Sequence, residues 1–359
     1  MKRVSDSISF KSFSDSCKES LGSYLQELVR NNLPKAKIEK IKKLKVYMLI
    51  SFCSAPVLLV LSLLFMSFNL MHIGWSLVFL TFIVFLIGYL FFRQKTKTTK
   101  EIASIIKRTI PKDEIYHSLF KQLNEKWEYV GSDLSKIGAL YSPDFVQQAF
   151  SVNEINKNKP SSIPYAAHLY SRESVNAVLL DQKYPLYYQN IVWRQIIERY
   201  DSRGNRFVEY RFFNSCLIRI DASLLDEEKR ASFSLFESGF FTKKDRINLE
   251  NDQFNKVFKL HSNDELRMRT YFTVLAQEVL TETYHQNINY TACRSIHTYV
   301  NDWLITYNFQ TKPGFMQIDT PQNTIKEDLI INHIFWDIMK DVYTFYFLVQ
   351  LIYIPVYLY

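Results

Sequence analysis

The chain divides, by its pattern of hydrophobic and polar positions, into a charge-free segment near the N-terminus and a longer mixed segment behind it. Residues Val46–Phe92 contain no Asp, Glu, Lys or Arg. One helical crossing of about 30 Å of hydrocarbon needs about 20 apolar residues, so this run is long enough for two crossings. We expect membrane helices at about 46–68 and 73–92, joined by a turn at Asn69–Gly74, where Asn, His and Gly interrupt the aliphatic run.

Basic residues flank both ends of the charge-free run. Lys35–Lys45 reads KAKIEKIKKLK, and Arg93–Lys100 reads RQKTKTTK. Because Lys and Arg accumulate on the cytoplasmic side of membrane helices, we expect a multi-pass protein of the cell (inner) membrane with both termini in the cytoplasm. A cleaved signal peptide is disfavoured because the run starts about 45 residues into the chain and is too long. A buried hairpin of a soluble core is disfavoured because the run has no polar face.

The charge-free run lacks the residues that a channel or carrier needs. Ionisable side chains inside a membrane mark ion paths and proton relays, and none lies within Val46–Phe92. The run contains Pro56 and several small residues that ease close helix packing: Ser51, Ser54, Ser62, Gly74 and Gly88. We therefore interpret the segment as a membrane anchor.

Segments on both sides of the anchor show helical periodicity. Residues 1–45 are expected to form a cytoplasmic amphipathic and basic segment, with a helix that ends near Pro34. Its apolar face consists of Leu21, Tyr24, Leu25 and Leu28. Residues 93–152 are expected to form a helical juxtamembrane region, with helices at Lys100–Ile110 and Asp113–Tyr129 separated by Pro111. The first of these is in a position to continue the second membrane helix.

A polar stretch with Pro and Ser, Asn153–Pro164, is the clearest internal linker. It separates the helical stalk from residues 165–359, which we expect to be a cytoplasmic α+β domain. The expected fold class is thus α+β: a two-helix transmembrane hairpin, a helical stalk, and a mixed or antiparallel sheet with packed helices.

A β-hairpin gives the strongest strand signal in the body. Ile191–Tyr200 and Arg206–Asp221 are rich in β-branched and aromatic residues, and the turn sequence DSRGN joins them. Apolar residues at positions 208, 210 and 212 alternate with charged residues at 209 and 211. We therefore expect one buried face and one wet face.

A dense mixture of charged and aromatic residues, LENDQFNKVFKLHSNDELRMRTYF, occupies Leu249–Phe272. Asn251 is positioned to cap a short helix with the apolar face Phe254, Val257 and Phe258. Ser262 and Glu265 form an S-x-x-E capping box for a second helix, and Glu265 is spaced to pair with Arg269. The second helix has the expected apolar stripe Met268, Phe272, Leu275 and Val279. Capping and packing explain nearly all of these residues without a catalytic role.

The end of the chain predicts a helix packed across the sheet. Its apolar stripe consists of Ile331, Ile334, Ile338, Val342, Phe345, Val349 and Ile352. The residues opposing that stripe at first are Asn332, Asp337, Lys340 and Asp341. A third membrane span at 342–359 is the alternative, but the segment is barely long enough and contains Gln350 and Pro355.

The positive charge of the chain is confined to its first part. The 359 residues carry a net charge of +8, which invites a nucleic-acid interpretation. Residues 1–100 hold 15 Lys and Arg against 5 Asp and Glu, or +10, and residues 101–359 hold 29 against 31, or −2. Because the large C-terminal part has no excess of cations for a phosphate backbone, we expect no nucleic-acid partner.

No motif indicates a catalytic, cofactor or metal site. The patterns GxxxxGK, GxGxxG, HExxH and GxSxG are absent. The widely spaced Cys17, Cys53, Cys216 and Cys293 indicate free thiols in a reducing compartment. His261, His285 and His297 fall near Cys293, but their spacing matches no standard zinc pattern. The acidic sequence DEEK at Asp226–Lys229 is interpreted as a solvated loop.

The stretch Leu249–Arg269 resembles a family of uncharacterised bacterial membrane proteins, a domain of unknown function. Members carry a pattern like LEDxxFxxxFxVYSxDQxEARYxLT after a two-helix membrane hairpin. The matching positions are Leu249, Glu250, Asn251, Phe254, Phe258, Ser262, Asp264, Glu265 and Arg269. The sequence departs with Asn251 for an acidic residue, with Leu260 and His261 for Val and Tyr, and with Arg267. The resemblance implies a cytoplasmic α+β domain on a membrane hairpin and supplies no activity.

These observations favour a membrane-anchored cytoplasmic interaction or scaffold module over an enzyme. The expected partners are the lipid bilayer and a membrane or cytoplasmic protein, with no cofactor. The candidate interaction or structural motif consists of Glu250, Asp264, Glu265, Arg267 and Arg269. Two alternatives stay open: a membrane-tethered hydrolase with an unrecognised site around Glu250–Arg269, and a lipid or envelope sensor that uses the basic flanks and the aromatic tail.

Overall fold

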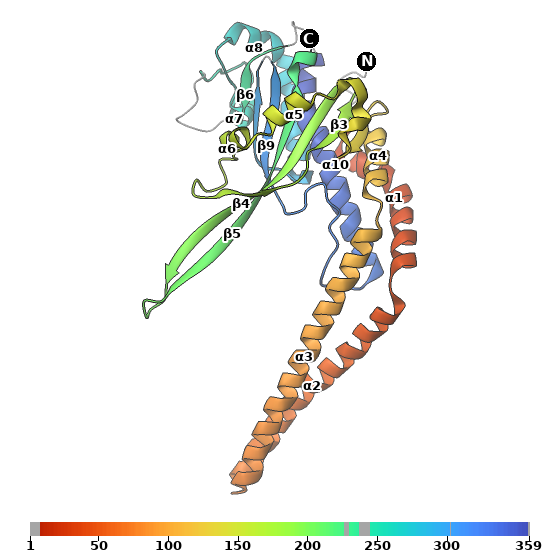
Figure 1. The fold of residues 1–359 in the computed structure, drawn as a ribbon, viewed down its shortest axis with the longest axis vertical. Helices are drawn as coiled ribbons and strands as arrows, with labels where there is room; N and C mark the ends of the chain where they lie inside the picture. Colours follow the sequence, from red (N-terminus) through yellow and green to blue (C-terminus); the bar gives the residue numbers. More distant parts are fainter. Residues whose placement is uncertain (1–7, 226–229, 237–244, 302, 358–359) are drawn as a thin grey trace. The chain divides into compact units, whose positions relative to one another are not determined.

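A computed structural model describes residues 8–225, 230–236, 245–301 and 303–357 (Figure 1). The chain forms two compact units. Unit 1 comprises Met1–Cys17, Lys112–Gln317 and Ile338–Tyr359, and unit 2 comprises Lys18–Pro111 and Ile318–Asp337. The acidic segment Asp226–Lys229, expected to be a solvated loop, lies outside the described residues.

Two long helices of unit 2, α2 (Lys35–Ser67) and α3 (Met71–Thr109), contain the charge-free run. Both are long and apolar enough to cross a membrane. The turn between them is shorter than expected: it centres on Asn69, which adopts a left-handed conformation with φ 60°, and Gly74 already lies in α3. The predicted Lys100–Ile110 helix is the continuation of α3, which ends at Thr109.

Small residues bring α2 and α3 together within unit 2. The buried residues at this contact include Ser51, Ala55 and Ser62 of α2 and Gly74 and Gly88 of α3. A Cβ added to Gly88 would lie 3.0 Å from the Ser51 Cβ, and one added to Gly74 would lie 2.4 Å from the Met66 Cγ. Close approach of the two backbones thus depends on these glycines, as in helix pairs that pack without large side chains between them.

Helix α1 (Phe10–Asn32) is longer than the predicted amphipathic helix. Its buried apolar positions are Phe10, Phe13 and Cys17 in unit 1, and Leu21, Leu25 and Val29 in unit 2. Tyr24, placed on the apolar face by the sequence, is exposed. The buried positions from 13 onward recur every four residues, so Tyr24 falls at the edge of the stripe.

Unit 1 is built on an antiparallel sheet, which confirms the α+β class. The strand order is β1-β3-β4-β5-β9-β8-β6-β7, with β2 beside β4. The strands are β1 (Glu128–Gly131), β2 (His168–Arg172), β3 (Asn176–Leu180), β4 (Tyr184–Tyr200), β5 (Arg206–Asp221), β6 (Phe233–Leu235), β7 (His261–Ser262), β8 (Arg294–Val300) and β9 (Leu304–Thr311). The predicted hairpin is therefore correct, with Tyr200 opposite Arg206.

The region between α3 and β2 differs from the predicted stalk and linker. Helix α4 (Lys112–Leu123) ends earlier than expected, and Tyr129 lies in β1 opposite Val178. The end of the predicted helix was wrong because Trp127 and Tyr129 alternate as in a strand and both are buried. The segment expected to be a featureless linker contains most of α6 (Val152–Lys157), and its Ile155 is buried.

Helices pack on both faces of the sheet. On one face, Phe345 of α10 (Glu327–Tyr357) contacts Tyr188 of β4, with ring centroids 5.0 Å apart. Tyr187, the next residue along the strand, points to the opposite face and joins a core that includes Ala149 of α5 (Pro143–Ala149) and Ile155 of α6. The sheet is therefore the middle layer of unit 1.

Helix α10 confirms the predicted C-terminal helix, but it is more deeply buried than its pattern suggested. The predicted stripe is buried from Ile334 to Ile352. Asp337 and Asp341, predicted to lie opposite that stripe, are 6% and 0% exposed. Among the described residues only α2 and α3 meet the length and hydropathy of a membrane span.

Candidate interaction surface

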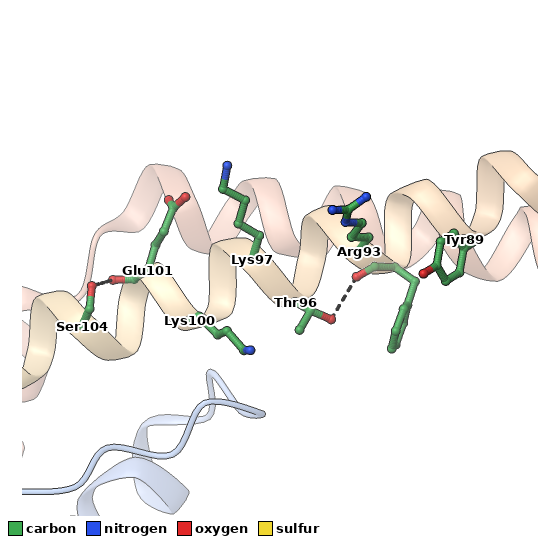
Figure 2. A pocket seen from close by; sticks show the side chains of 8 residues that line it. Tyr89, Arg93, Thr96, Lys97, Lys100, Glu101 and Ser104 are labelled. Atoms are coloured by element: carbon green, nitrogen blue, oxygen red, sulfur yellow. Dashed lines mark hydrogen bonds between the residues drawn. The ribbon is translucent and has the colours of Figure 1, made fainter. Parts of the chain in front are cut away.

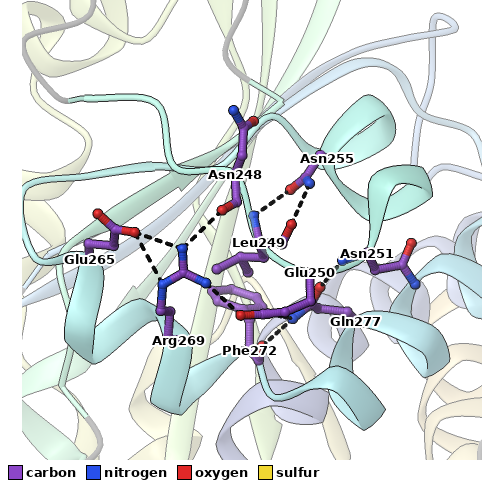
Figure 3. Close-up of polar contacts among 9 residues, drawn as sticks. All are labelled: Asn248, Leu249, Glu250, Asn251, Asn255, Glu265, Arg269, Phe272 and Gln277. Carbon is purple, nitrogen blue, oxygen red and sulfur yellow. Dashed lines mark hydrogen bonds and ion pairs between the residues drawn. The ribbon is translucent and has the colours of Figure 1, made fainter.

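Arg269 of α8 (Glu265–Tyr271) gathers two acidic residues of the candidate motif around its guanidinium (Figure 3). It donates to Glu265 Oε1 at 2.7 and 3.1 Å and to Glu250 Oε1 at 2.5 Å. Gln277 of α9 (Val274–Asn287) donates to the other Glu250 oxygen at 3.0 Å. The hydrogen bonds from Gln277 and Arg269 lower the pKa of Glu250. This cluster ties the loop before α7 (Asp252–Phe258) to α8 and α9.

The remaining motif residues form the N-cap of α8. Asp264 is the N-cap, because its side chain accepts a hydrogen bond from the Arg267 backbone N–H at 2.9 Å. The prediction that Ser262 is the N-cap was wrong. Ser262 lies in β7, and its hydroxyl donates to the Ser232 carbonyl at 2.7 Å. The predicted cap of α7 is correct, since Asn251 accepts from Gln253 and Phe254.

The predicted helix after Asp264 is two helices. Thr273 interrupts it and caps α9 by accepting from the Ala276 N–H at 3.3 Å. The predicted stripe therefore holds for Met268 and Phe272, which are buried, but fails at Leu275, which is exposed. The sequence signal for this break is the threonine itself, because Thr is favoured at N-caps and disfavoured inside helices.

The contacts of the candidate motif account for its residues by capping and pairing. Glu250, Glu265 and Arg269 are half-exposed, with side-chain exposures of 50%, 62% and 40%. Both glutamates share one guanidinium, which leaves neither in the desolvated setting that raises a carboxyl pKa for acid chemistry. Within the described ranges, no group of three or more His, Cys, Asp or Glu is placed to hold a metal ion.

A different surface stands out in unit 1: the far half of the β4–β5 hairpin, residues 195–213, here called the arm. Figure 1 shows both strands running on as a two-stranded ribbon beyond the other strands. Strand β2 pairs with β4 only as far as Arg194, and β9 pairs with β5 only as far as Asn214. Beyond these points the two strands of the arm pair only with each other among the described residues.

One face of the arm is apolar and exposed. In an antiparallel pair, directly opposite residues point to the same face, and Ile196 faces Tyr210 while Glu198 faces Val208. The large side chains on this face are 41–66% exposed: Ile196, Tyr200, Val208, Tyr210 and Phe212, with Tyr170 of β2 beside them. The prediction that this face is buried was wrong, because no described element of unit 1 covers it.

Arg194 holds the aromatic rings at the base of this face. Its guanidinium lies 4.7 Å from the Tyr170 ring centroid and 5.5 Å from the Tyr210 centroid. The Tyr170 ring also meets Phe212 edge to face at 5.3 Å. Cation–π and edge-to-face contacts limit the motion of exposed rings. These contacts therefore hold part of the apolar face in place within unit 1.

The opposite face and the tip of the arm are held by polar contacts. Glu209 accepts from Arg199 at 2.9 Å and from Arg211 at 2.8 Å. At the turn, Asp201 accepts from the Arg203 and Asn205 backbone N–H groups at 2.9 and 2.8 Å. Hydrogen bonds from Asn205 and Arg203 lower the pKa of Asp201. These bonds support the register that the arm inherits from the β4–β5 pairing within the sheet.

Two charged side chains lie inside unit 1 rather than on its surface. Arg219 of β5 is 1% exposed and donates to Thr306 at 2.8 Å and to Glu154 of α6 at 3.2 Å. Burial lowers its pKa to about 10, opposed by Glu154. Asp341 of α10 accepts from the Met316 N–H at 2.7 Å. Burial raises the pKa of Asp341 to about 7, opposed by Lys312 at 3.7 Å.

No family model matches this chain, and no curated protein or solved structure shows detectable similarity to it. The family resemblance carried by Leu249–Arg269 is therefore unconfirmed. The class that the fold defines is an α+β protein with two helices long and apolar enough to cross a membrane.

Proposed function

We propose that this protein is a membrane-anchored docking module. In this proposal α2 and α3 cross the bacterial inner membrane, both termini and unit 1 lie in the cytoplasm, and a protein partner binds the apolar face of the arm. The observation that carries the proposal is the exposure of that face, because the apolar side of a sheet is ordinarily buried. The motif at Leu249–Arg269 supports membership of the family of uncharacterised bacterial membrane proteins.

The surface of α2 and α3 supports membrane insertion. Large apolar side chains on these helices point away from their contact and are 59–67% exposed: Leu49, Val57, Leu63, Phe79 and Phe82. Water disfavours a continuous apolar surface of this kind, whereas lipid accepts it. The basic flanks at Lys35–Lys45 and Arg93–Lys100 support the cytoplasmic placement of both ends.

The composition of the arm supports a protein with an apolar patch and an acidic rim as the partner. Tyr, Phe and Arg are enriched in the centres of protein interfaces, and all three line the exposed face. Arg194 and the arm together contain five arginines against three carboxylates, a net charge of +2. A partner with acidic residues around its apolar patch would match both the face and this excess. A two-stranded ribbon is marginal in water, so a covering surface also stabilises the arm.

The charges of the arm argue against lipid, and against a second copy of the arm, as the occupant of its apolar face. The Glu198–Arg206 ion pair lies on the apolar face, and insertion into lipid would desolvate it at high cost. A second copy of the arm would bring two surfaces of net positive charge together. The hydrolase alternative has no geometric support, since Glu250 and Glu265 are both paired with Arg269.

Photo-crosslinking from the two faces of the arm tests the proposal. A photoreactive phenylalanine analogue replaces Tyr210 on the apolar face or, as the matched control, Phe207 on the opposite face. Both side chains are aromatic and about half exposed, at 54% and 48%. The full-length protein is irradiated in its own membrane, and products are identified by mass spectrometry.

We expect one protein to be captured from position 210 and not from position 207. Capture should be lost in a Phe212→Ser variant. It should recur when the purified partner is added to the purified protein. The partner residues that are crosslinked should be apolar and have acidic neighbours. A product with the mass of two copies, adducts to lipid, or equal labelling from both positions would overturn the docking proposal. Extraction of the chain by carbonate without detergent would overturn the membrane anchor instead.

A further inference from the structure

A groove of about 550 Å³ lies along α3 where the charge-free run gives way to the basic flank (Figure 2). Two neighbouring rows of side chains line it, each with a spacing of four residues. One row contains Tyr89, Arg93 and Lys97, and the other contains Phe92, Thr96 and Lys100. Because residues four apart lie one above the other on a helix, each row runs from an aromatic ring to a cation.

The three cations of the groove outnumber its one carboxylate. Among the residues that the structure describes, Arg93, Lys97 and Lys100 form no direct ion pair, and all three are exposed. The acidic residue of the groove, Glu101, is instead bound to Lys37 of α2, with the Nζ atom 2.7 Å from Oε2. The hydrogen bond from Lys37 lowers the pKa of Glu101. The groove therefore keeps an excess of positive charge.

Recognition in this groove would be ionic. The Thr96 hydroxyl donates to the Phe92 carbonyl at 3.0 Å, and Ser104 donates to the Glu101 carbonyl at 2.8 Å. Both hydroxyl hydrogens are thus committed to the helix backbone. The groups that remain for a ligand are the three cations, with Arg93 and Lys97 on one side of α3 and Lys100 on the other in Figure 2, and the rings of Tyr89 and Phe92 nearer the charge-free run. A ligand that fits this order has an anionic group joined to an apolar chain.

We propose that this groove binds the phosphate of an anionic phospholipid, with its glycerol and upper acyl region against Tyr89 and Phe92. Aromatic rings favour the boundary between hydrocarbon and headgroups, and Lys and Arg just beyond it bind anionic lipids. The inference adds a ligand site to the proposed docking module and rests on the proposed insertion of α2 and α3. It places the ligand on α3 itself, apart from the arm.

Native mass spectrometry of the full-length protein in neutral detergent tests this site by titration with phosphatidylglycerol and, separately, with phosphatidylcholine. The groove variant combines Arg93→Gln, Lys97→Gln and Lys100→Gln. The matched control combines Lys42→Gln, Lys43→Gln and Lys45→Gln, three exposed lysines of the other flank. A third variant, Glu101→Gln, removes the negative charge beside the groove. Inorganic phosphate in large excess serves as the competitor that lacks an apolar chain.

We expect phosphatidylglycerol to bind in preference to phosphatidylcholine. Each lost cation should weaken binding about fivefold, because a Lys or Arg near an anionic surface contributes about 1 kcal/mol. The groove variant should therefore lose about 100-fold, the control far less, and Glu101→Gln should bind more tightly. A gain in affinity from Glu101→Gln cannot arise from misfolding.

Equal losses in the groove and control variants would overturn the site, since they would indicate diffuse attraction to both flanks. Displacement of the lipid by inorganic phosphate alone would overturn the assignment to a lipid and leave a site for a free anion. Failure of the wild-type chain to enter lipid nanodiscs of equal phosphatidylcholine and phosphatidylglycerol would overturn the membrane anchor and, with it, this site. Normal insertion without lipid preference would overturn the site alone.

Discussion

Ile196 and Tyr210 lie directly opposite each other in the arm, and both side chains remain about half exposed, at 50% and 54%. Five residues earlier on the same strand, Ile191 points to the opposite face and is buried in the core with Ala149 and Ile155. The arm therefore continues the hydrogen-bonded ladder of the sheet without continuing its core. The same residue type thus has very different consequences for stability at two positions of one strand.

The first prediction compares these two isoleucines. Ile191→Ala should lower the free energy of unfolding by about 2–5 kcal/mol, because it removes buried methylene groups from a packed core. Ile196→Ala should cost under about 1 kcal/mol, the value of one exposed cross-strand contact. Denaturant unfolding of the full chain in detergent, followed by tryptophan fluorescence, measures both. A similar cost at the two positions would mean that the arm is covered within unit 1.

The second prediction concerns Asp341 and pH. Its pKa is raised by burial from 3.8 to about 7, so the folded state binds this proton more tightly than the unfolded chain does. Its contribution to stability is therefore greatest below about pH 4, decreases as the pH rises, and is lost above about pH 7. Asp341→Asn should stabilise the protein at pH 8, by an amount on the order of a few kcal/mol.

Thermal unfolding of wild type and Asp341→Asn between pH 4 and pH 8 isolates this group from others that titrate. The difference in stability between Asp341→Asn and the wild type should widen as the pH rises and level off above about pH 7. The charged groups that face Asp341 are Lys312 and Lys112, and a Lys312→Met variant should raise the pKa of Asp341 further. A gap that stays constant with pH would contradict the prediction.

The third prediction concerns the buried Arg219. Glu154→Ala leaves its guanidinium without an ionic partner, which should cost about 2 kcal/mol, below the 3–5 kcal/mol of a fully buried pair because Glu154 is partly exposed. Adding Arg219→Met should recover much of this loss, since the buried charge is then gone. Urea midpoints of the two single variants and the double variant provide the measurement. Additive losses would show that the pair does not interact.

The fourth prediction distinguishes a cap from a reactive carboxylate at Asp264. Asp264→Ala should lower the free energy of unfolding by about 1 kcal/mol, and Asp264→Asn should restore most of it, because Asn is an equally good N-cap. Both variants lose the carboxylate, so a reactive carboxylate without a capping role predicts no difference in stability between them. Chemical unfolding of the three proteins decides between these roles.

Local periodicity in the sequence predicted the elements whose signal is contained in a single segment. The two apolar helices, the hairpin at 191–221 and the C-terminal helix are of this kind. The exposure of Tyr210 was not predictable in this way, because it depends on where β2 and β9 stop pairing with β4 and β5. An alternating strand looks the same whether or not another layer covers it.

The raised pKa of Asp341 could not be predicted from the sequence, because it depends on tertiary contacts that bury the carboxyl group. The sequence pattern places Asp341 on the polar side of α10, yet the side chain is fully buried and accepts a hydrogen bond from the Met316 N–H. The motif around Arg269 was more accessible to prediction, since Glu265 and Arg269 are one helical turn apart. The shift of the cap from Ser262 to Asp264 followed from β7, a strand of two residues that no periodic pattern reveals.

The outer edges of the arm present backbone N–H and C=O groups that no other described strand takes up. Such edges act as templates for strand addition. Arg199, Glu209 and Arg211 stand along these strands as ionised pairs. Charged side chains on an edge discourage the addition of another chain. The charges of the arm thus disfavour strand addition at its edges, while its apolar face stays exposed.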